Sequence, residues 1–93
     1  MDAAEAGSRV KLREGAASWR EIDGETILLD LDSSKYLGLN RAGTVLWPAI
    51  VQGSSRDALV AKLAAEFDLE TERAAVDVDA FIAACRERNL LEP

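Results

Sequence analysis

Few residues of this chain have the chemistry that catalysis needs. Its 93 residues include no histidine and a single cysteine, Cys85. The lack of histidine removes Ser-His-Asp and Cys-His nucleophilic sites, the common zinc sites and the usual general base near neutral pH. One cysteine forms neither an internal disulfide nor a cysteine-based metal cluster. We therefore expect a protein that is not an enzyme and that uses no metal and no other cofactor.

The titratable side chains near the C-terminus form no reactive group. Asp77 and Asp79 lie two residues apart, so on a helix they point to different sides and make no carboxylate pair. A solvated face is the simpler expectation for both, with a basic residue of a partner as the alternative contact for Asp77. Arg86 and Arg88 suit the last turn of a helix, and the alternative is a contact with an acidic peptide or a partner enzyme. For Cys85 we expect a buried, inert thiol.

Charge and length limit the classes of partner. The chain has 11 basic and 17 acidic residues, and its net charge of −6 disfavours binding to phosphate backbones. A hydrophobic content of 48% in a chain of this length indicates one small globular domain. No apolar run approaches the roughly 20 residues of a membrane-spanning helix, and the acidic start lacks the basic region of a signal peptide. We expect a cytoplasmic protein with no nucleic-acid and no membrane partner.

The elements that position these side chains begin with strands. Residues 1–8 show no periodicity, so we expect a flexible N-terminal tail there and a folded domain over residues 9–93. The next thirty residues follow the two-residue period of β-strands, and the turn dipeptide Asp23-Gly24 divides them. A second turn follows at residues 32–34, where Asp and Ser side chains can bond the nearby backbone. The sequence predicts an antiparallel sheet of three or four short strands. Apolar residues alternate at Val10 and Leu12 and again at Ile27, Leu29 and Leu31, and Trp19 and Ile22 lie between them after a break at Glu14-Gly15.

Three helices follow, because the hydrophobic period changes to 3.6 at Asn40. Asn40 is the expected cap of the first helix, which contains Pro48 and which Gly53 ends. Ser54 or Ser55 caps the second, with Asp57 in a capping-box position after Ser54, and Thr71 caps the third. Asn89 is expected to end the third helix in a left-handed conformation. The apolar stripes are predicted at Val45, Leu46, Ala49 and Ile50, at Leu59, Val60, Leu63, Ala64 and Phe67, and at Ala75, Val78, Phe81, Ile82 and Cys85.

This order of elements predicts an α+β fold of winged helix-turn-helix type, with a three-stranded antiparallel sheet followed by three helices. Such a fold often reads DNA, so the charge of its last helix is informative. Residues 68–93 hold three basic and seven acidic residues, and a reading helix with that balance would be repelled by phosphate. A small transcriptional regulator therefore stays only as an alternative.

The feature that remains is a strand edge. The strand over residues 35–39 is short and contains Gly38, so another backbone could approach it and add as a further strand. The third helix is a plausible wall for a neighbouring groove, because Phe81 and Ile82 are adjacent and cannot both point at the core. Proline at Leu37 is expected to remove a donor that such a guest strand needs.

A series of residues at fixed spacing resembles the PqqD-like proteins over roughly residues 9–92. The series is Lys35-Tyr36-Leu37-Gly38-Leu39-Asn40, then Gly43, Val45, Trp47 and Gly53, Leu59 to Leu63, Glu66-Phe67-Asp68, Asp77 to Ile82, and Asn89-Leu90-Leu91. Two departures from the family pattern are Asn89, where a glycine is usual, and Pro48 within the first helix.

The resemblance implies a recognition element for ribosomally made, modified peptides. The leader segment of a precursor would lie as an added strand against the third sheet strand, beside the third helix. The stand-alone form is most similar to the recognition proteins of lasso-peptide clusters, which present the precursor to a leader peptidase or another maturation enzyme. A PqqD-type chaperone of another peptide pathway is the sibling alternative. Leader-binding residues would be Lys35, Tyr36, Leu37, Gly38 and Leu39 on the strand and Asp77, Phe81, Ala84 and Arg88 on the helix.

Several of these side chains have a structural interpretation beside the functional one. Tyr36 is as well explained by packing on a neighbouring strand as by contact with a peptide. Leu37 and Leu39 share one face and are expected in the core, with their backbone as the functional part. Trp47 is expected in the core, whereas Trp19 has no clear place.

Overall fold

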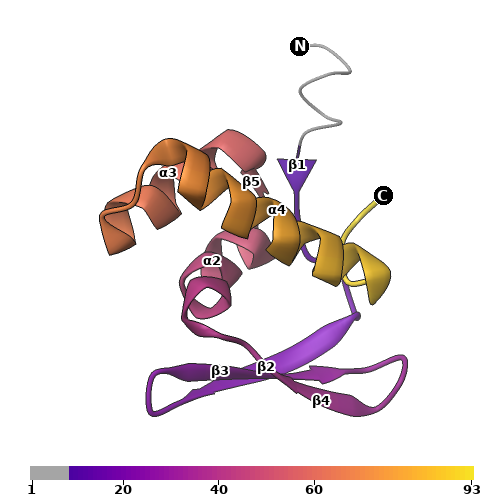
Figure 1. The fold of residues 1–93 in the computed structure, drawn as a ribbon. Helices are drawn as coiled ribbons and strands as arrows, with labels where there is room; N and C mark the ends of the chain where they lie inside the picture. Colours follow the sequence, from indigo (N-terminus) through magenta and orange to yellow (C-terminus); the bar gives the residue numbers. More distant parts are fainter. Residues whose placement is uncertain (1–8) are drawn as a thin grey trace.

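The computed structural model describes residues 9–93, and the predicted flexible tail, residues 1–8, lies outside this range. The chain forms two layers, with a small sheet below and the helices above it (Figure 1). The sheet contains β2 (Ala17–Ile22), β3 (Glu25–Asp30) and β4 (Lys35–Gly38) in the order β2-β3-β4, and both pairings are antiparallel. The predicted α+β class and the three-stranded antiparallel sheet are therefore confirmed, and the winged helix-turn-helix assignment stays a prediction.

The two turns of the sheet are where the sequence predicts them. Asp23 and Gly24 both have a positive φ, 54° and 81°, as a two-residue hairpin turn of the favoured hand requires. In the second turn the organising side chain is that of Asp30, not those of residues 32–34. The Asp30 carboxylate accepts hydrogen bonds from the backbone N–H groups of Asp32 and Ser33, at 3.0 and 3.3 Å. The Asp32 carboxylate instead pairs with Arg13 at 2.7 Å.

The segment around Val10 and Leu12 does not join this sheet. β1 (Arg9–Val10) pairs with β5 (Ser54–Ser55), which lies between two helices in the sequence. Beyond it, Leu12 forms a bridge to Leu91 in the C-terminal segment. The N-terminal and C-terminal ends of the described chain are thus hydrogen-bonded to each other rather than to the edge of the sheet.

The buried face of β3 is the opposite of the one that the apolar alternation suggests. Thr26, Leu28 and Asp30 are buried, whereas the Ile27 and Leu29 side chains lie half-buried on the outer face and Leu31 is 47% exposed. Residues 27–29 of β3 are all apolar, so alternation alone allows either Leu28 or the pair Ile27 and Leu29 to face the core. The helices cover only one face of the sheet, and Leu28 packs there (Figure 1).

The three predicted helices are present, as α2 (Arg41–Gln52), α3 (Arg56–Phe67) and α4 (Thr71–Glu87). The Asn40 side chain caps α2 by accepting from the Gly43 N–H, and Gly53 ends the helix with φ of 100°. Ser55 caps α3 through the Ala58 N–H, so Asp57 is not in the capping-box position. Thr71 is the first residue of α4 and not its cap. The cap position is Glu70, which makes no side-chain cap bond.

The core lies where the helices meet each other and the inner face of the sheet. Trp47 is 1% exposed, as predicted, and its ring makes an edge-to-face contact with Trp19 at 5.6 Å between centroids. Asn89 has φ of 57°, and the chain then returns to bury Leu90 and Leu91. The other buried apolar residues are Val10, Ala16, Leu28, Leu46, Ile50, Leu59, Val60, Leu63, Ala74, Val78, Ile82 and Cys85. No helix within residues 9–93 has the length and apolar character needed to cross a membrane.

Candidate functional site

One edge of the sheet is open at β4. Of the residues that the structure describes, only β3 pairs with this strand. The Leu39 N–H donates to the Thr26 carbonyl at 2.9 Å. Backbone groups alternate in direction along an antiparallel ladder, so the N–H and C=O groups of Lys35 and Leu37 also point toward β3. The N–H and C=O groups of Tyr36 and Gly38 therefore point outward, away from the sheet. The expectation that Leu37 supplies the free donor is therefore wrong, because the register assigns the open edge to Tyr36 and Gly38.

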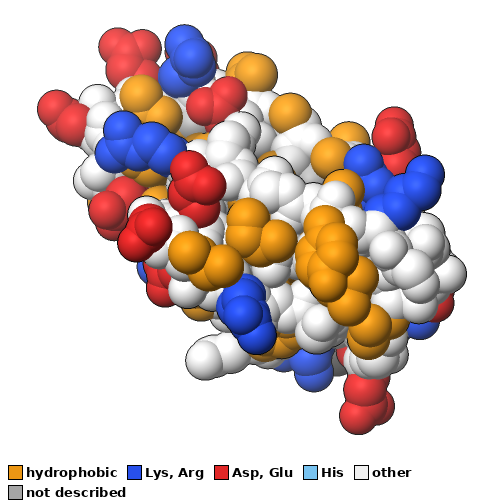
Figure 2. Space-filling view, turned by 90° about the horizontal axis from the view of Figure 1, so that it is seen from below, with side chains coloured by type: hydrophobic (Ala, Val, Ile, Leu, Met, Phe, Trp, Pro, Cys, Tyr) orange, Lys and Arg blue, Asp and Glu red, His pale blue; other side chains and the backbone are white. Residues whose placement is uncertain are grey.

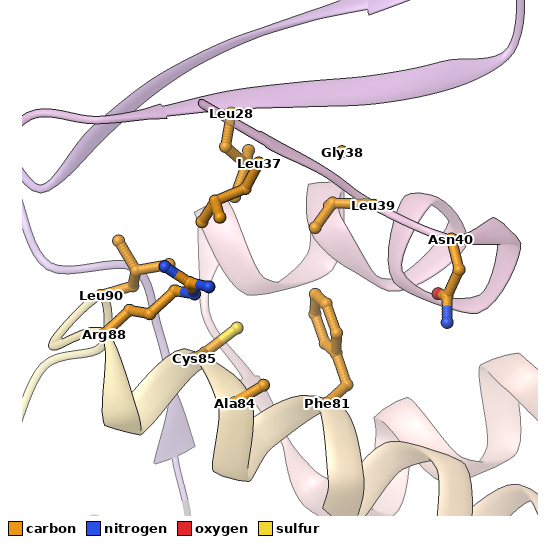
Figure 3. Close-up of a pocket in the computed structure, with 10 residues that line it drawn as sticks. All are labelled: Leu28, Leu37, Gly38, Leu39, Asn40, Phe81, Ala84, Cys85, Arg88 and Leu90. Atoms are coloured by element: carbon orange, nitrogen blue, oxygen red, sulfur yellow. The ribbon is translucent and has the colours of Figure 1, made fainter. Parts of the chain in front are cut away.

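A hollow of about 220 Å³ lies between β4 and α4. Figure 3 shows the side chains of the strand and of the helix facing each other across it. Its walls are mostly apolar, as a surface for another apolar side chain should be. The lining residues are Leu28, Leu37, Gly38, Leu39, Asn40, Phe81, Ala84, Cys85, Arg88 and Leu90.

A second hollow continues the first along α4. Asn40, Phe81 and Ala84 line both, and Asp77, Ala80 and Ala42 complete the second. We call the two together the groove. Along α4 it extends from Asp77 to Arg88, a length of about 16 Å at the rise of an α-helix. About five residues of an extended strand span the same distance.

Phe81 divides the two hollows. Its neighbour Ile82 is 8% exposed and belongs to the core, while Phe81 is half-buried and points into the groove, as the adjacency of the two residues predicts. The Phe81 ring passes close to Gly43 at the start of α2. A Cβ atom on Gly43 would lie only 2.8 Å from Phe81 Cε1. Any larger residue at position 43 would clash with the Phe81 ring, so glycine is needed here for the ring to occupy its observed position.

Cys85 lies on the floor of the groove and is 3% exposed. Burial raises the pKa of the Cys85 thiol to about 11, and the nearby Arg88 guanidinium opposes this shift. The thiol is therefore protonated near neutral pH, in agreement with the expected inert cysteine.

The two aspartates of α4 have different partners. Asp79 receives two hydrogen bonds from the Arg56 guanidinium, at 2.6 and 2.9 Å, and this hydrogen bonding lowers the pKa of the Asp79 carboxyl. Asp77 lies at the end of the groove, and its contact with Arg73 in the preceding turn is long, at 3.8 Å. They form no carboxylate pair, as predicted, and Asp77 is the one that faces the groove.

The structure brings most of the predicted site residues together. Leu37, Gly38, Leu39, Phe81, Ala84 and Arg88 line the first hollow and Asp77 lines the second. Lys35 begins β4 but lines neither of them. Tyr36 is 73% exposed and points to the outer face of the sheet, so it does not pack into the fold. Leu37 and Leu39 are half-buried rather than core residues.

Sequence reasoning missed six groove residues, which are Leu28, Asn40, Ala42, Ala80, Cys85 and Leu90. Asn40 was considered only as a cap, and Leu28 falls between two residues of the stronger alternation. Leu90 reaches the groove because the left-handed Asn89 turns the chain back, and that signal was present in the sequence. Residues 9–93 contain no group of three or more His, Cys, Asp or Glu side chains that could hold a metal ion.

Comparisons with known proteins agree with this geometry. Residues 25–91 match the family described as coenzyme PQQ synthesis protein D (PqqD). The fold is similar to that of TbiB1, solved in complex with the TbiA(beta) leader peptide, with 28% sequence identity and a TM-score of 0.79 over 88% of this chain and 94% of TbiB1. It is also similar to a lasso peptide synthetase B1 complexed with its leader peptide, at 24% identity and a TM-score of 0.76 over 92% of this chain and 99% of that one. No curated protein sequence gives a significant match.

Proposed function

Since this chain belongs to the PqqD family, we propose that it binds the leader segment of a ribosomally made precursor peptide as a fourth strand on β4. The observation that carries the proposal is the open edge of β4 beside an apolar groove. The leader backbone would pair with the N–H and C=O of Tyr36 and Gly38, and alternate leader side chains would enter the groove. The protein acts in this proposal by binding and not by catalysis.

The comparisons support leader binding, and we propose the lasso-peptide version of this function from the resemblance of the sequence. TbiB1, which was solved with a leader peptide bound, is similar to this chain over most of both lengths. From the resemblance of the sequence we further propose that the bound leader is presented to a leader peptidase or to another maturation enzyme. A PqqD-type chaperone of a different peptide pathway would use the same edge, and the identity of the precursor that binds separates the two.

The first test is calorimetric titration with synthetic leaders. The probes are the TbiA(beta) leader peptide and the leader segment of any precursor-like short reading frame found beside this gene. Specific binding of the first, with a Kd between micromolar and nanomolar, is the expected result for an extended guest strand in a groove of this size. The proposal is overturned if neither peptide gives a heat of binding at high concentration and neither displaces the other from the protein.

Proline variants test the strand register directly. Tyr36→Pro removes an outward N–H, which an edge strand tolerates, so the fold should survive while leader affinity falls at least tenfold. Tyr36→Ala is the matched control, because it removes the same side chain and keeps the donor. Leu37→Pro should instead unfold the hairpin between β3 and β4. Equal affinity of Tyr36→Pro and Tyr36→Ala would argue against pairing at this edge.

The outer face of the sheet supports the second step, presentation to an enzyme. Ile22, Ile27, Leu29 and Tyr36 line a shallow hollow there, with Ile22 49% and Tyr36 73% exposed. Figure 2 shows hydrophobic side chains gathered on this face, with charged side chains around them. Exposed apolar side chains grouped on one face, with polar residues such as Ser18 and Arg20 beside them, are a common mark of a partner surface. Tyr36 joins this face to the open edge, so a bound leader would extend the same surface.

A single charge on this face separates the two steps. Ile22 lies on β2, two strands away from the open edge, so Ile22→Glu should leave leader affinity unchanged and weaken capture of a leader peptidase found to act on the bound precursor. Val76→Glu on α4 is the matched control, because Val76 is also apolar and 64% exposed but lies on a different surface. Loss of capture in both variants, or in neither, contradicts a role of the outer face.

A further inference from the structure

We propose that the groove selects leaders with a carboxylate side chain at its Arg88 end, so that the protein reads charge as well as shape. This inference rests on the proposed function and adds a chemical requirement to it. It assigns to Arg88 the role of a specificity-determining residue.

Among residues 9–93, Arg20, Arg41, Arg86 and Arg88 have neither an ion pair nor a side-chain hydrogen bond, and of these four only Arg88 lines the groove. Arg13 and Arg56 form short ion pairs with Asp32 and Asp79, at 2.7 and 2.6 Å. The Arg88 guanidinium lies at one end of the groove, near Leu37 and Leu90 (Figure 3).

The surroundings of Arg88 favour one chemical class of ligand. The nearby walls come from Leu28, Leu37, Cys85 and Leu90, so a bound strand would exclude water from the guanidinium. An arginine that loses water in this way gains most from a carboxylate, which it can bind through two parallel hydrogen bonds.

The preference for an acid is confined to this end of the groove. Asp77 marks the other end, three helical turns away, and would repel a leader carboxylate. The protein as a whole carries a charge of −6, so acidic peptides gain nothing from general attraction. An acid therefore strengthens binding only where the leader passes Arg88.

The experiment is a double-mutant cycle on the leader that binds in the titration above. Each Asp or Glu of that peptide is replaced in turn by Asn or Gln, and affinities are measured with the wild-type protein and with Arg88→Gln. We expect Arg88→Gln to weaken binding by about tenfold, and one leader position to lose its effect in that variant. Arg86→Gln is the matched control, since Arg86 lies in the same last turn, is exposed and lines neither hollow. It should change affinity by less than twofold.

The outcomes separate this inference from the proposed function. A leader that binds the wild-type protein but shows no coupled position, or that binds Arg88→Gln as well as the wild type, overturns the charge preference and leaves strand addition intact. A leader that does not bind the wild-type protein overturns strand addition and, with it, this inference. Thermal unfolding of Arg88→Gln shows whether a lost affinity comes from lost folding, and Arg88→Lys should recover part of the affinity.

Discussion

At the scale of single residues, the shape of the groove depends on a contact between Phe81 and Gly43. We expect Gly43→Ala to destabilise the fold by about 1–3 kcal/mol. The added methyl group would lie 2.8 Å from the Phe81 ring, which now packs directly against α2 at Gly43. The ring would be pushed into the groove, so leader affinity should fall as well. Denaturant unfolding and titration measure the two effects.

Gly38→Ala is the matched control for this prediction. Its new methyl group would have one near neighbour, Ile27 Cδ1 at 3.8 Å, so stability should change little. In the double variant Gly43→Ala/Phe81→Leu, the smaller side chain should restore part of the lost stability. Equal costs for the two alanine variants would mean that the contact with Phe81 has no energetic importance.

Cys85 gives a second prediction at this scale. A rise of the thiol pKa from its ordinary 9.0 to about 11 lowers the thiolate fraction at pH 8 by roughly a hundredfold, and burial slows access further. Alkylation by iodoacetamide should therefore be at least a hundredfold slower in the folded protein than in the urea-unfolded chain. A saturating leader should slow it again, because Cys85 lies on the floor of the groove.

The same pKa shift predicts how stability depends on pH. The unfolded chain releases the thiol proton near pH 9 and the folded protein near pH 11, so this contribution is complete below pH 9 and is lost as the pH rises between these values. Cys85→Ala should lack this component of the alkaline loss. Parallel stability curves for the two proteins between pH 8 and 11 would contradict the assignment.

At the scale of elements, the junction of β4 and α2 connects the open edge to the helical layer. Asn40→Ala should cost about 1 kcal/mol of stability through loss of the helix cap, and it should also weaken leader binding because Asn40 lines both hollows. Ser55→Ala removes the equivalent cap of α3, far from the groove, and should cost a similar amount with no change in affinity. If both variants bind the leader equally well, this junction does not shape the site.

Local signals in the sequence were sufficient for most elements. The hairpin at Asp23-Gly24, the Asn40 cap and the left-handed Asn89 were predictable, because each depends on the chemistry of one or two residues. The pairing of β1 with β5 was not, since it joins residues far apart in the sequence. The buried face of β3 also depends on which side the helices cover, and a run of three apolar residues does not encode that choice.

For the site, the sequence predicted the strand and the helix but not the details of their contact. Phe81 was predictable as a groove residue because Ile82 beside it takes the core position. The outward donors of β4 were assigned wrongly, because the register depends on which residue of β3 lies opposite Leu39. Leu28 was missed because its place in the groove depends on which face of the sheet the helices cover, whereas Leu90 could have been found from the left-handed turn at Asn89.

At the scale of the whole molecule, the two proposed partners use different surfaces. The leader would enter between the sheet and helix layers, and the maturation enzyme would contact the opposite, outer face of the sheet. The shared element is β4, whose edge pairs with the leader and whose Tyr36 side chain points outward. One strand thus connects both interactions, while the core beneath it needs no change.

The whole-molecule charge separates this function from that of a DNA-binding regulator. A leader that binds only the folded state, at a hundred times its Kd, should stabilise the protein by about 2.7 kcal/mol. For a domain of this size, the unfolding temperature should then rise on the order of 10 °C.

Duplex DNA containing the neighbouring promoter should change neither the unfolding temperature nor the mobility of the DNA in a gel, even at 50 mM salt. A protein of charge −6 with an acidic last helix is repelled by phosphate. A salt-sensitive gel shift together with an absent thermal response to leader would favour the regulator, since it would mean that local basic groups outweigh the overall charge.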